Sequence, residues 1–232
     1  MPDASSPPAK KSLHVAIIPD GNRRWAKAHR LQAWQGHQKA SGVLRELLTW
    51  CKDNPAIGTL TVWGFSTENW KRDPELVAKL MELLEQHLKE EMVSIHERHI
   101  HVVHSGRKDR LSPSLATLLV TMEEETKTYD EFTLHLALDY GGKDEIVRAV
   151  RHMKTPDTVT EESFRSFLDH PELPDIDCLI RTAGEKRISN FFLWQGAYAE
   201  LIFLEKFFPD LTITDMEEAL AEYRKRTRRF GK

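Results

Sequence analysis

A single carboxylate and a group of cations follow the first apolar run of the chain, in the sequence HVAIIPDGNRRWAK. The carboxylate is Asp20, and the cations are Arg23, Arg24 and Lys27. Cations at the start of a helix suit a diphosphate, because free backbone N–H groups and the helix dipole add to their charge. A carboxylate repels phosphate unless a metal ion lies between them, and Mg²⁺ is often held by one or two carboxylates together with phosphate oxygens. We therefore expect Asp20 to bind Mg²⁺ and the cations to bind a diphosphate.

A second group of cations lies in the sequence LIRTAGEKRISNFFLWQGAYAE. Arg181 ends a predicted strand, and Arg187 and Ser189 follow in a short loop. Arginine makes two-point contacts with phosphate oxygens, and serine adds a neutral donor. The apolar residues 190–194 must be buried beside these charges, which argues against an ordinary surface loop. Glu200 begins the next predicted strand and is a candidate second carboxylate for Mg²⁺.

The loop GFSTENW places small polar groups next to a tryptophan, a combination that can order a lid over a reaction site. Large apolar side chains elsewhere are available to wall a cavity: Trp63, Phe65, Leu134, Leu136 and Leu138. Two diphosphate-type subsites, one Mg²⁺ and an apolar cavity together suggest allylic diphosphates as substrates.

Each of these features also has a plainer structural interpretation. Asp20 alone fits a helix N-cap equally well, and Glu200 alone fits an acid at a strand edge. The apolar side chains fit an ordinary core. The histidines of HERHIHVVH straddle a helix end and a strand, so we expect a structural role there, as for His14, rather than a metal site. The sequence YGGK lacks the Walker spacing and fits a tight turn before a helix.

Strand and helix patterns alternate along the chain. Short apolar, β-branched runs predict six strands, at residues 14–18, 59–65, 99–104, 132–138, 177–180 and 200–204. Amphipathic spacing predicts further helices at residues 39–52, 73–98, 114–128, 143–154, 160–168 and 215–230. This alternation is typical of an α/β fold: one domain with a central, mostly parallel six-stranded sheet flanked by helices. Ligands gather beyond the carboxyl ends of parallel strands, so the loops PDGNRRW, GFSTENW, HSGRKDR and LDYGGK should face one crevice.

Composition limits the class of protein. The chain has 232 residues, 40% of them hydrophobic, which is enough for one sizeable core. Its formal net charge of −3 argues against a nucleic-acid-binding domain, which is usually strongly basic. Two cysteines without metal-like spacing favour a reducing, cytoplasmic location, and no apolar run is long enough to span a membrane, although peripheral contact stays open. The polar, proline-rich residues 1–12 are expected to form a disordered leader before a single domain at residues 13–232.

The chain resembles the cis-prenyltransferases, the family of undecaprenyl diphosphate synthases. The resemblance covers nearly the whole chain and rests on HVAIIPDGNRRWAK, GFSTENWKRDPELVAKLMELL, LDYGGKDEIVRAV, IRTAGEKRISNFFLWQGAYAEL and the tail RRFG, in that order. It implies a Mg²⁺-dependent homodimeric transferase whose catalytic domain holds an apolar tunnel. Such an enzyme adds isopentenyl diphosphate to an allylic primer, usually farnesyl diphosphate, and makes a Z-polyprenyl diphosphate.

The resemblance also implies roles for single residues. Asp20 is the essential acid near Mg²⁺, and Glu200 helps to hold the ion. Asn22 and the released diphosphate are the candidate acceptors of the proton, and because an amide is a poor base, positioning of the substrate is the preferred catalytic role of Asn22. The residues implied at the allylic diphosphate site and its pocket are Gly21, Arg23, Arg24, Trp25, His37, Ser66, Asn69, Trp70 and Arg72. Those implied to hold isopentenyl diphosphate are Arg181, Arg187 and Ser189. Those implied to wall the tunnel are Gly64, Leu84 and Leu134, and those implied to reach the neighbouring subunit's site are Arg229 and Gly231.

Several positions depart from the pattern common in bacterial members of the family. Arg23 replaces a glycine, Ala33 replaces an arginine, and Ala183 replaces a glycine, which leaves primer choice and rate open. The small Gly64 favours a long product, for which undecaprenyl diphosphate, a lipid carrier in cell-wall synthesis, is the default. The alternatives are a short-chain or irregular-coupling synthase and a non-catalytic partner subunit of the same fold. The intact Asp20 argues against the partner subunit.

Overall fold

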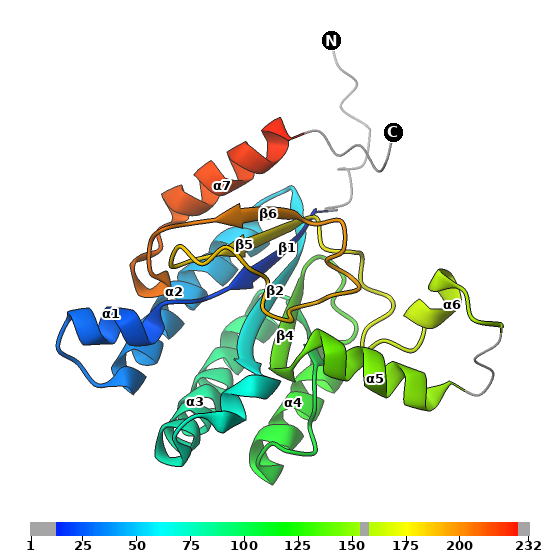
Figure 1. Cartoon of the computed structure of the whole chain (residues 1–232), viewed down its shortest axis with the longest axis horizontal. Coiled ribbons are helices and arrows are strands. Elements are labelled where there is room, and N and C mark those ends of the chain that lie inside the picture. The colour runs from blue at the N-terminus through cyan, green and yellow to red at the C-terminus, as the bar shows by residue number, and fades with distance from the viewer. Residues whose placement is uncertain (1–12, 154–157, 227–232) are drawn as a thin grey trace.

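A computed structural model describes residues 13–153 and 158–226 of the chain. Its centre is one six-stranded sheet with the strand order β3-β4-β2-β1-β5-β6. Figure 1 labels β4, β2, β1, β5 and β6 of this sheet. Every neighbouring pair of strands runs parallel, so the expected six-stranded α/β sheet is confirmed. The strands are β1 (Leu13–Ile18), β2 (Ile57–Ser66), β3 (His101–Ser105), β4 (Thr133–Tyr140), β5 (Cys178–Arg181) and β6 (Glu200–Phe203).

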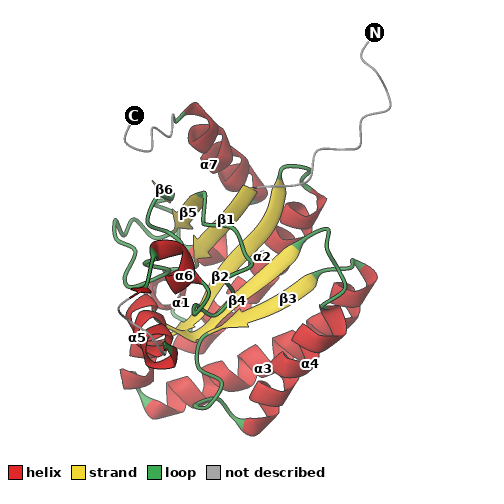
Figure 2. Cartoon of the chain, turned by 90° about the vertical axis from the view of Figure 1, so that its right-hand side faces the viewer, coloured by secondary structure: helices red, strands yellow, loops and turns green. Residues whose placement is uncertain are grey.

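Helices and loops cover both faces of the sheet (Figure 2). The helices are α1 (Asn22–Ala28), α2 (Ala33–Asp53), η1 (Thr67–Lys71), α3 (Pro74–Glu97), α4 (Pro113–Thr126), α5 (Gly142–His152), α6 (Glu161–Arg165), η3 (Phe208–Asp210) and α7 (Ile213–Lys225). Side chains of β1 alternate between two cores. Val15 and Ile17 pack in the larger core with α2, α3, α4 and α7, whereas Ala16 and Ile18 pack on the other face with Phe191.

The predicted element ends agree best for the strands, each of which falls within two residues of its expected range. The structure begins α2 six residues earlier than predicted, at Ala33. Its N-terminus is closed by reciprocal hydrogen bonds between Gln32 and Gln35, and glutamine is not a favoured capping residue. The expected leader at residues 1–12 and the expected helix end at residue 230 lie outside the described residues. No helix in the described part of the chain is both long and apolar enough to cross a membrane.

A chain of buried polar side chains crosses the sheet from β1 to β3. The Nε2 atom of His14 lies 2.6 Å from the Thr61 hydroxyl, which lies 3.0 Å from Nδ1 of His135. Nε2 of His135 is in turn 2.7 Å from the Ser105 hydroxyl. These four buried side chains come from four adjacent strands and form hydrogen bonds with one another. The structural role expected for His14 agrees with this placement.

We expect acid to destabilise the protein well before its carboxylates are protonated. Burial lowers the pKa of His14 and of His104 from about 6.5 to about 4, and it also lowers the pKa of His135 well below its ordinary value. Between these pH values the unfolded chain binds protons that the folded chain does not. The free energy of unfolding should therefore fall by up to about 1.4 kcal/mol per pH unit for each histidine as the pH drops below about 6.5. Urea unfolding at pH 8.0, 7.0, 6.0 and 5.0 measures this fall, and equal stability at all four values would contradict it.

Candidate active site

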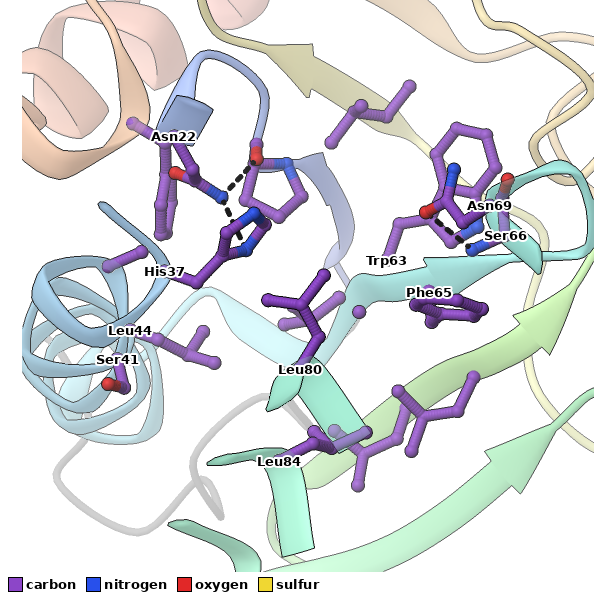
Figure 3. A pocket seen from close by; sticks show the side chains of 18 of the residues that line it. Asn22, His37, Ser41, Leu44, Trp63, Phe65, Ser66, Asn69, Leu80 and Leu84 are labelled. Carbon is purple, nitrogen blue, oxygen red and sulfur yellow. Dashed lines mark hydrogen bonds between the residues drawn. The ribbon is translucent and has the colours of Figure 1, made fainter. Parts of the chain in front are cut away.

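A large cavity opens at the carboxyl edge of the sheet and runs between the sheet and helices α2 and α3 (Figure 3). Its volume is about 720 Å³. Asp20, Ser66 and Arg181 lie at its mouth, where β1, β2 and β5 end. A second hollow of about 640 Å³ shares Asp20, Asn22, His37 and Arg72 with the cavity and extends over α1. We call it the basic hollow, because its wall contains Arg23, Arg24, Lys27, Arg30 and Arg72.

The Asp20 carboxylate is held by cations from two directions. Nη2 of Arg181 donates to it over 2.8 Å, and a guanidinium nitrogen of Arg24 lies 3.4 Å away. The backbone N–H of Gly21 donates to the same carboxylate over 2.6 Å. Burial opposes ionisation of Asp20, but these hydrogen bonds and the nearby charges outweigh it, so the pKa of Asp20 lies below its ordinary value. Asp20 is therefore an anion at neutral pH, as a metal ligand must be.

Arg181 connects Asp20 to the predicted second phosphate subsite. Its side chain is buried, and Nη1 donates to the Ser189 hydroxyl over 2.8 Å and to the backbone carbonyl of Arg187. Arg181, Arg187 and Ser189 all line the cavity. The structure thus brings the two cationic stretches of the sequence together around one carboxylate.

The turn after Asp20 requires glycine. Gly21 has φ of +99°, a backbone conformation that residues with a side chain rarely adopt. A Cβ atom at this position would lie 2.6 Å from the Phe207 ring and 3.0 Å from Cβ of Ala183. The tight approach lets α1 begin at Asn22 and directs Asn22 into the cavity while Arg23 lines the basic hollow.

Four of the five cations of the basic hollow have no ion-pair partner among the described residues: Arg23, Lys27, Arg30 and Arg72. Arg23 is exposed on α1, and Arg72 follows η1 on the opposite side of the hollow. Burial lowers the pKa of Arg72, and the positive charge of Arg23 lowers it further. Arg24, by contrast, also pairs with Glu185 at 2.9 Å. The uncompensated charge of Arg23 and Arg72 makes this hollow suited to an anion.

Four buried polar atoms on residues of the cavity wall also lack a partner in the described structure. Two of them are Oδ1 of Asn22 and Nε2 of His37, and the others are Nε1 of Trp63 and Nε of Arg181. The other sides of the Asn22 and His37 side chains face each other, with Nδ2 of Asn22 lying 3.4 Å from Nδ1 of His37 (Figure 3). Burial, together with Arg72 and Arg23, lowers the pKa of His37 to about 4, so the ring is neutral. With Nδ1 accepting from Asn22, Nε2 carries the proton and is a free donor for a substrate oxygen.

The residues present fit Mg²⁺ held jointly with a substrate. Within the described residues there is no cluster of three or more histidine, cysteine, aspartate or glutamate side chains that would hold a metal alone. Asp20 supplies one ionised carboxylate, and the orphaned Oδ1 of Asn22 supplies a second oxygen at the same end of the cavity. Mg²⁺ prefers oxygen ligands and usually completes its shell with water and substrate phosphate. The expected structural role of the HERHIHVVH histidines is consistent with this, since His96 contacts Tyr129 and Glu125.

Glu200, the expected second metal ligand, lies at the other edge of the sheet. In the register of the sheet it is opposite Cys178, at the start of β5, whereas Arg181 ends that strand. Along the strand direction Glu200 is therefore three residues away from Arg181, which is about 10 Å at roughly 3.3 Å per residue. Glu200 instead pairs with Arg226 at 3.0 Å. The structure therefore does not bring Glu200 and Asp20 together within one chain.

The two tryptophans expected to shape the pocket act from behind its wall. Neither Trp25 nor Trp70 is among the residues that line the cavity or the basic hollow. Nε1 of Trp25 donates to Asp210 over 2.7 Å, and Nε1 of Trp70 donates to Asp139 over 2.8 Å. Ser66 and Asn69 do line the cavity, and Ser66 N–H donates to Asn69 at 3.3 Å. The tryptophans therefore anchor α1 and η1, whose other residues face the site.

The apolar part of the wall contains the predicted tunnel residues. Gly64, Leu84 and Leu134 all line the cavity, from β2, α3 and β4 respectively. Gly64 lies where the pairing of β2 with β4 shifts register, between Trp63 and Phe65. The predicted end-motif residues Arg229 and Gly231 lie outside the described residues.

The chain matches the sequence model of a known family over most of its length. The sequence model of the family described as "Putative undecaprenyl diphosphate synthase" matches residues 18–231. This chain belongs to that family. The resemblance to the undecaprenyl diphosphate synthases that the sequence motifs indicated is therefore confirmed.

Curated relatives and solved structures match the chain over almost its whole length. An isoprenyl transferase of Aquifex aeolicus is 42% identical, covering 94% of this chain and 95% of its own. A tritrans,polycis-undecaprenyl-diphosphate synthase (geranylgeranyl-diphosphate specific) of Thermococcus kodakarensis is 43% identical, covering 94% and 86%. The crystal structure of lavandulyl diphosphate synthase from Lavandula x intermedia, in complex with dimethylallyl diphosphate, has a TM-score of 0.90 at 34% identity and covers 96% and 99%. A probable undecaprenyl diphosphate synthase from Campylobacter jejuni has a TM-score of 0.81 at 32% identity and covers 97% and 100%.

Two residues behind the synthase site were missed by sequence reasoning. Asp139 is fully buried, and its carboxylate accepts hydrogen bonds from Trp70 and from Arg110. Arg110 belongs to the HSGRKDR loop and Asp139 to LDYGGK, two loops that were expected to face the crevice, but neither residue lines the cavity or the basic hollow. Their pairing fixes η1 through Trp70. The excess of charge in HSGRKDR was a signal in the sequence that this loop has an acidic partner. The pairing of Arg110 with Asp139 also requires Asp139 to have φ of +49°, which the sequence does not reveal.

Proposed function

We propose that this prenyltransferase is a Mg²⁺-dependent cis-prenyltransferase that condenses isopentenyl diphosphate with an allylic diphosphate, farnesyl diphosphate by default, and releases a long Z-polyprenyl diphosphate. The observation that carries the proposal is the position of Asp20. This carboxylate lies between the Arg181–Ser189 pair and the unpaired cations of the basic hollow, at the mouth of an apolar cavity. Two diphosphates bound on its two sides would have their carbon chains at one opening.

The residues of the chain divide the reaction between two subsites. In this proposal the allylic diphosphate lies in the basic hollow, where Arg23, Arg72 and the free N–H of His37 stabilise the charge that builds on it as it leaves. Arg181, Arg187 and Ser189 hold isopentenyl diphosphate with its double bond toward the allylic carbon. Bound Mg²⁺ supplies further charge neutralisation at the phosphate oxygens. The new carbon–carbon bond forms as the carbon–oxygen bond to the allylic diphosphate breaks. The released diphosphate takes up the proton that the isopentenyl unit loses, while Asn22 positions the substrate.

A long product is favoured over a short one by the volume of the cavity, about 720 Å³, and by the small Gly64 in its wall. We further propose undecaprenyl diphosphate as the product, a homodimer in the cytoplasm as the working form, and peripheral contact with a membrane for product release. The structural similarity to lavandulyl diphosphate synthase supports the alternative of a short-chain or irregular-coupling synthase. Product size distinguishes the two.

The test is incubation of the pure protein with labelled isopentenyl diphosphate and Mg²⁺, with farnesyl, geranylgeranyl or dimethylallyl diphosphate as primer. We expect labelled chains that are longer than the primer by many five-carbon units. When EDTA is present from the start of the incubation, we expect no label to be incorporated into lipid. A ten-carbon product from dimethylallyl diphosphate would favour the alternative. Absence of any product with every primer would contradict the assignment and favour a non-catalytic partner subunit.

We expect Gly64→Leu to shorten the product by one or more five-carbon units. A Cβ atom at Gly64 would lie 2.4 Å from Cδ2 of Leu138, so Leu138 must move and the new side chain fills the cavity. Chromatographic sizing of the products measures the change. Gly42→Leu is the matched control, since a Cβ there meets nothing within 4 Å and Gly42 does not line the cavity. The same chain length in Gly64→Leu as in the parent would contradict this placement.

A further inference from the structure

Four polar side chains interrupt the apolar wall of the cavity, away from Asp20. Ser41 and Arg45 are one turn apart on α2, and His87 and Glu91 are one turn apart on α3. The polar residues at the mouth lie near the start of these helices, with His37 four residues into α2 and Arg72 just before α3. Ser41, Arg45, His87 and Glu91 therefore form a second polar zone, which we call the α2–α3 seam.

The side chains of the seam bridge the two helices in pairs. Oγ of Ser41 lies 3.2 Å from Nε2 of His87, and Nε of Arg45 donates to the Glu91 carboxylate. A guanidinium nitrogen of Arg45 also lies 3.9 Å from Glu90. These contacts close the space between α2 and α3 with polar atoms rather than with interdigitated apolar side chains.

The seam is also an exposed part of the wall that is made by α2 and α3. The Arg45 side chain lines the cavity and is at the same time 55% exposed to solvent. By contrast, Leu88, Leu134 and Leu138 line the cavity as buried members of the core. Exposed ion pairs contribute little to stability, because solvent and salt screen them. The seam therefore opens more easily than the core.

We propose that the α2–α3 seam is the outlet for the far end of a long polyprenyl chain, and that the Arg45–Glu91 and Ser41–His87 pairs limit the chain length that the cavity accepts. This inference rests on the proposed function for its substrate class. A short chain ends against apolar side chains and does not reach the seam. A longer chain must displace the two polar pairs, because hydrocarbon offers their atoms no hydrogen bonds.

Charge reversal at Arg45 tests the inference. Arg45→Glu places a third carboxylate beside Glu90 and Glu91, and repulsion among them should part the helices. Binding is measured by fluorescence titration with two unreactive probes, farnesyl phosphate and undecaprenyl phosphate. We expect Arg45→Glu to tighten binding of undecaprenyl phosphate by about fivefold, the ratio that corresponds to losing one exposed ion pair. Binding of farnesyl phosphate should change by less than about twofold, since its chain ends short of the seam.

Two further variants make the test specific. The double variant Arg45→Glu/Glu91→Arg restores the pairing with reversed polarity and should return the affinity for undecaprenyl phosphate to the parent value. Lys89→Glu is the matched control, because Lys89 pairs with Glu85 on the outer side of α3 and does not line the cavity. Equal changes for both probes, or none for either, would overturn the inference. Because the probes are not turned over, this result is independent of turnover, and a parent protein that lacks prenyl transfer counts against the proposed function alone.

Discussion

Replacing Asp20 by alanine should lower the rate of prenyl transfer by at least about 1,000-fold while the protein stays folded. Asp20 is the one carboxylate among the described residues that both lines the cavity and pairs with Arg181. Its loss removes the proposed Mg²⁺ ligand and leaves the cations on its two sides to repel each other. The rate is measured from the incorporation of labelled isopentenyl diphosphate, and the fold from circular dichroism and thermal unfolding.

Two controls separate the charge of Asp20 from its contacts. Asp20→Asn keeps the size of the side chain and an oxygen acceptor for Arg181 but removes the negative charge, so it should be nearly as inactive as Asp20→Ala. Asp215→Asn removes a carboxylate that pairs with Lys206 away from the cavity, and it should transfer prenyl units at the parent rate. Substantial turnover in Asp20→Ala would refute the metal role of this residue.

Replacing Arg181 by methionine should raise the KM for isopentenyl diphosphate by about 100-fold, with a much smaller effect on the KM for the allylic primer. The side chain of Arg181 is buried, and three of its neighbours at the site are Asp20, Arg187 and Ser189. Charge-assisted contacts from arginine to phosphate are among the strongest polar contacts in proteins. Initial rates at varied concentrations of each substrate measure the two KM values.

Arg181→Lys keeps the charge but not the forked geometry, and it should recover only part of the affinity. Arg98→Met is the matched control, because Arg98 pairs with Asp53 at the surface, at 3.5 Å, and does not line the cavity. An equal rise in both KM values for Arg181→Met would indicate a general collapse of the site rather than a dedicated subsite.

The architecture of this protein was predictable because its strands are short, apolar runs that each end at a turn signal. The parallel order then placed Asp20, Ser66 and Arg181 at one edge, where the structure has them. The same reasoning, applied consistently, separates Glu200 from them. Glu200 precedes its strand rather than following it, so in a parallel sheet it belongs to the opposite edge.

The orientation of the tryptophans was not predictable from the sequence. Trp70 lies in a polar loop that faces the site, yet its ring packs edge-on against Phe65 and its N–H reaches Asp139. That contact requires Asp139 to adopt a left-handed backbone conformation and Arg110 to approach from another loop. Such an arrangement depends on the tertiary structure, and local residue patterns carry no signal for it.

The ion pair between Asp20 and Arg181 couples the binding of a divalent ion to the binding of a diphosphate. In this structure Asp20, the proposed ligand of Mg²⁺, and Arg181, the proposed ligand of a diphosphate, neutralise each other's charge. Loading a divalent ion on Asp20 would release the guanidinium, and a diphosphate captured by the guanidinium would release the carboxylate. Each ligand should therefore strengthen the binding of the other, and linkage requires the two gains to be equal.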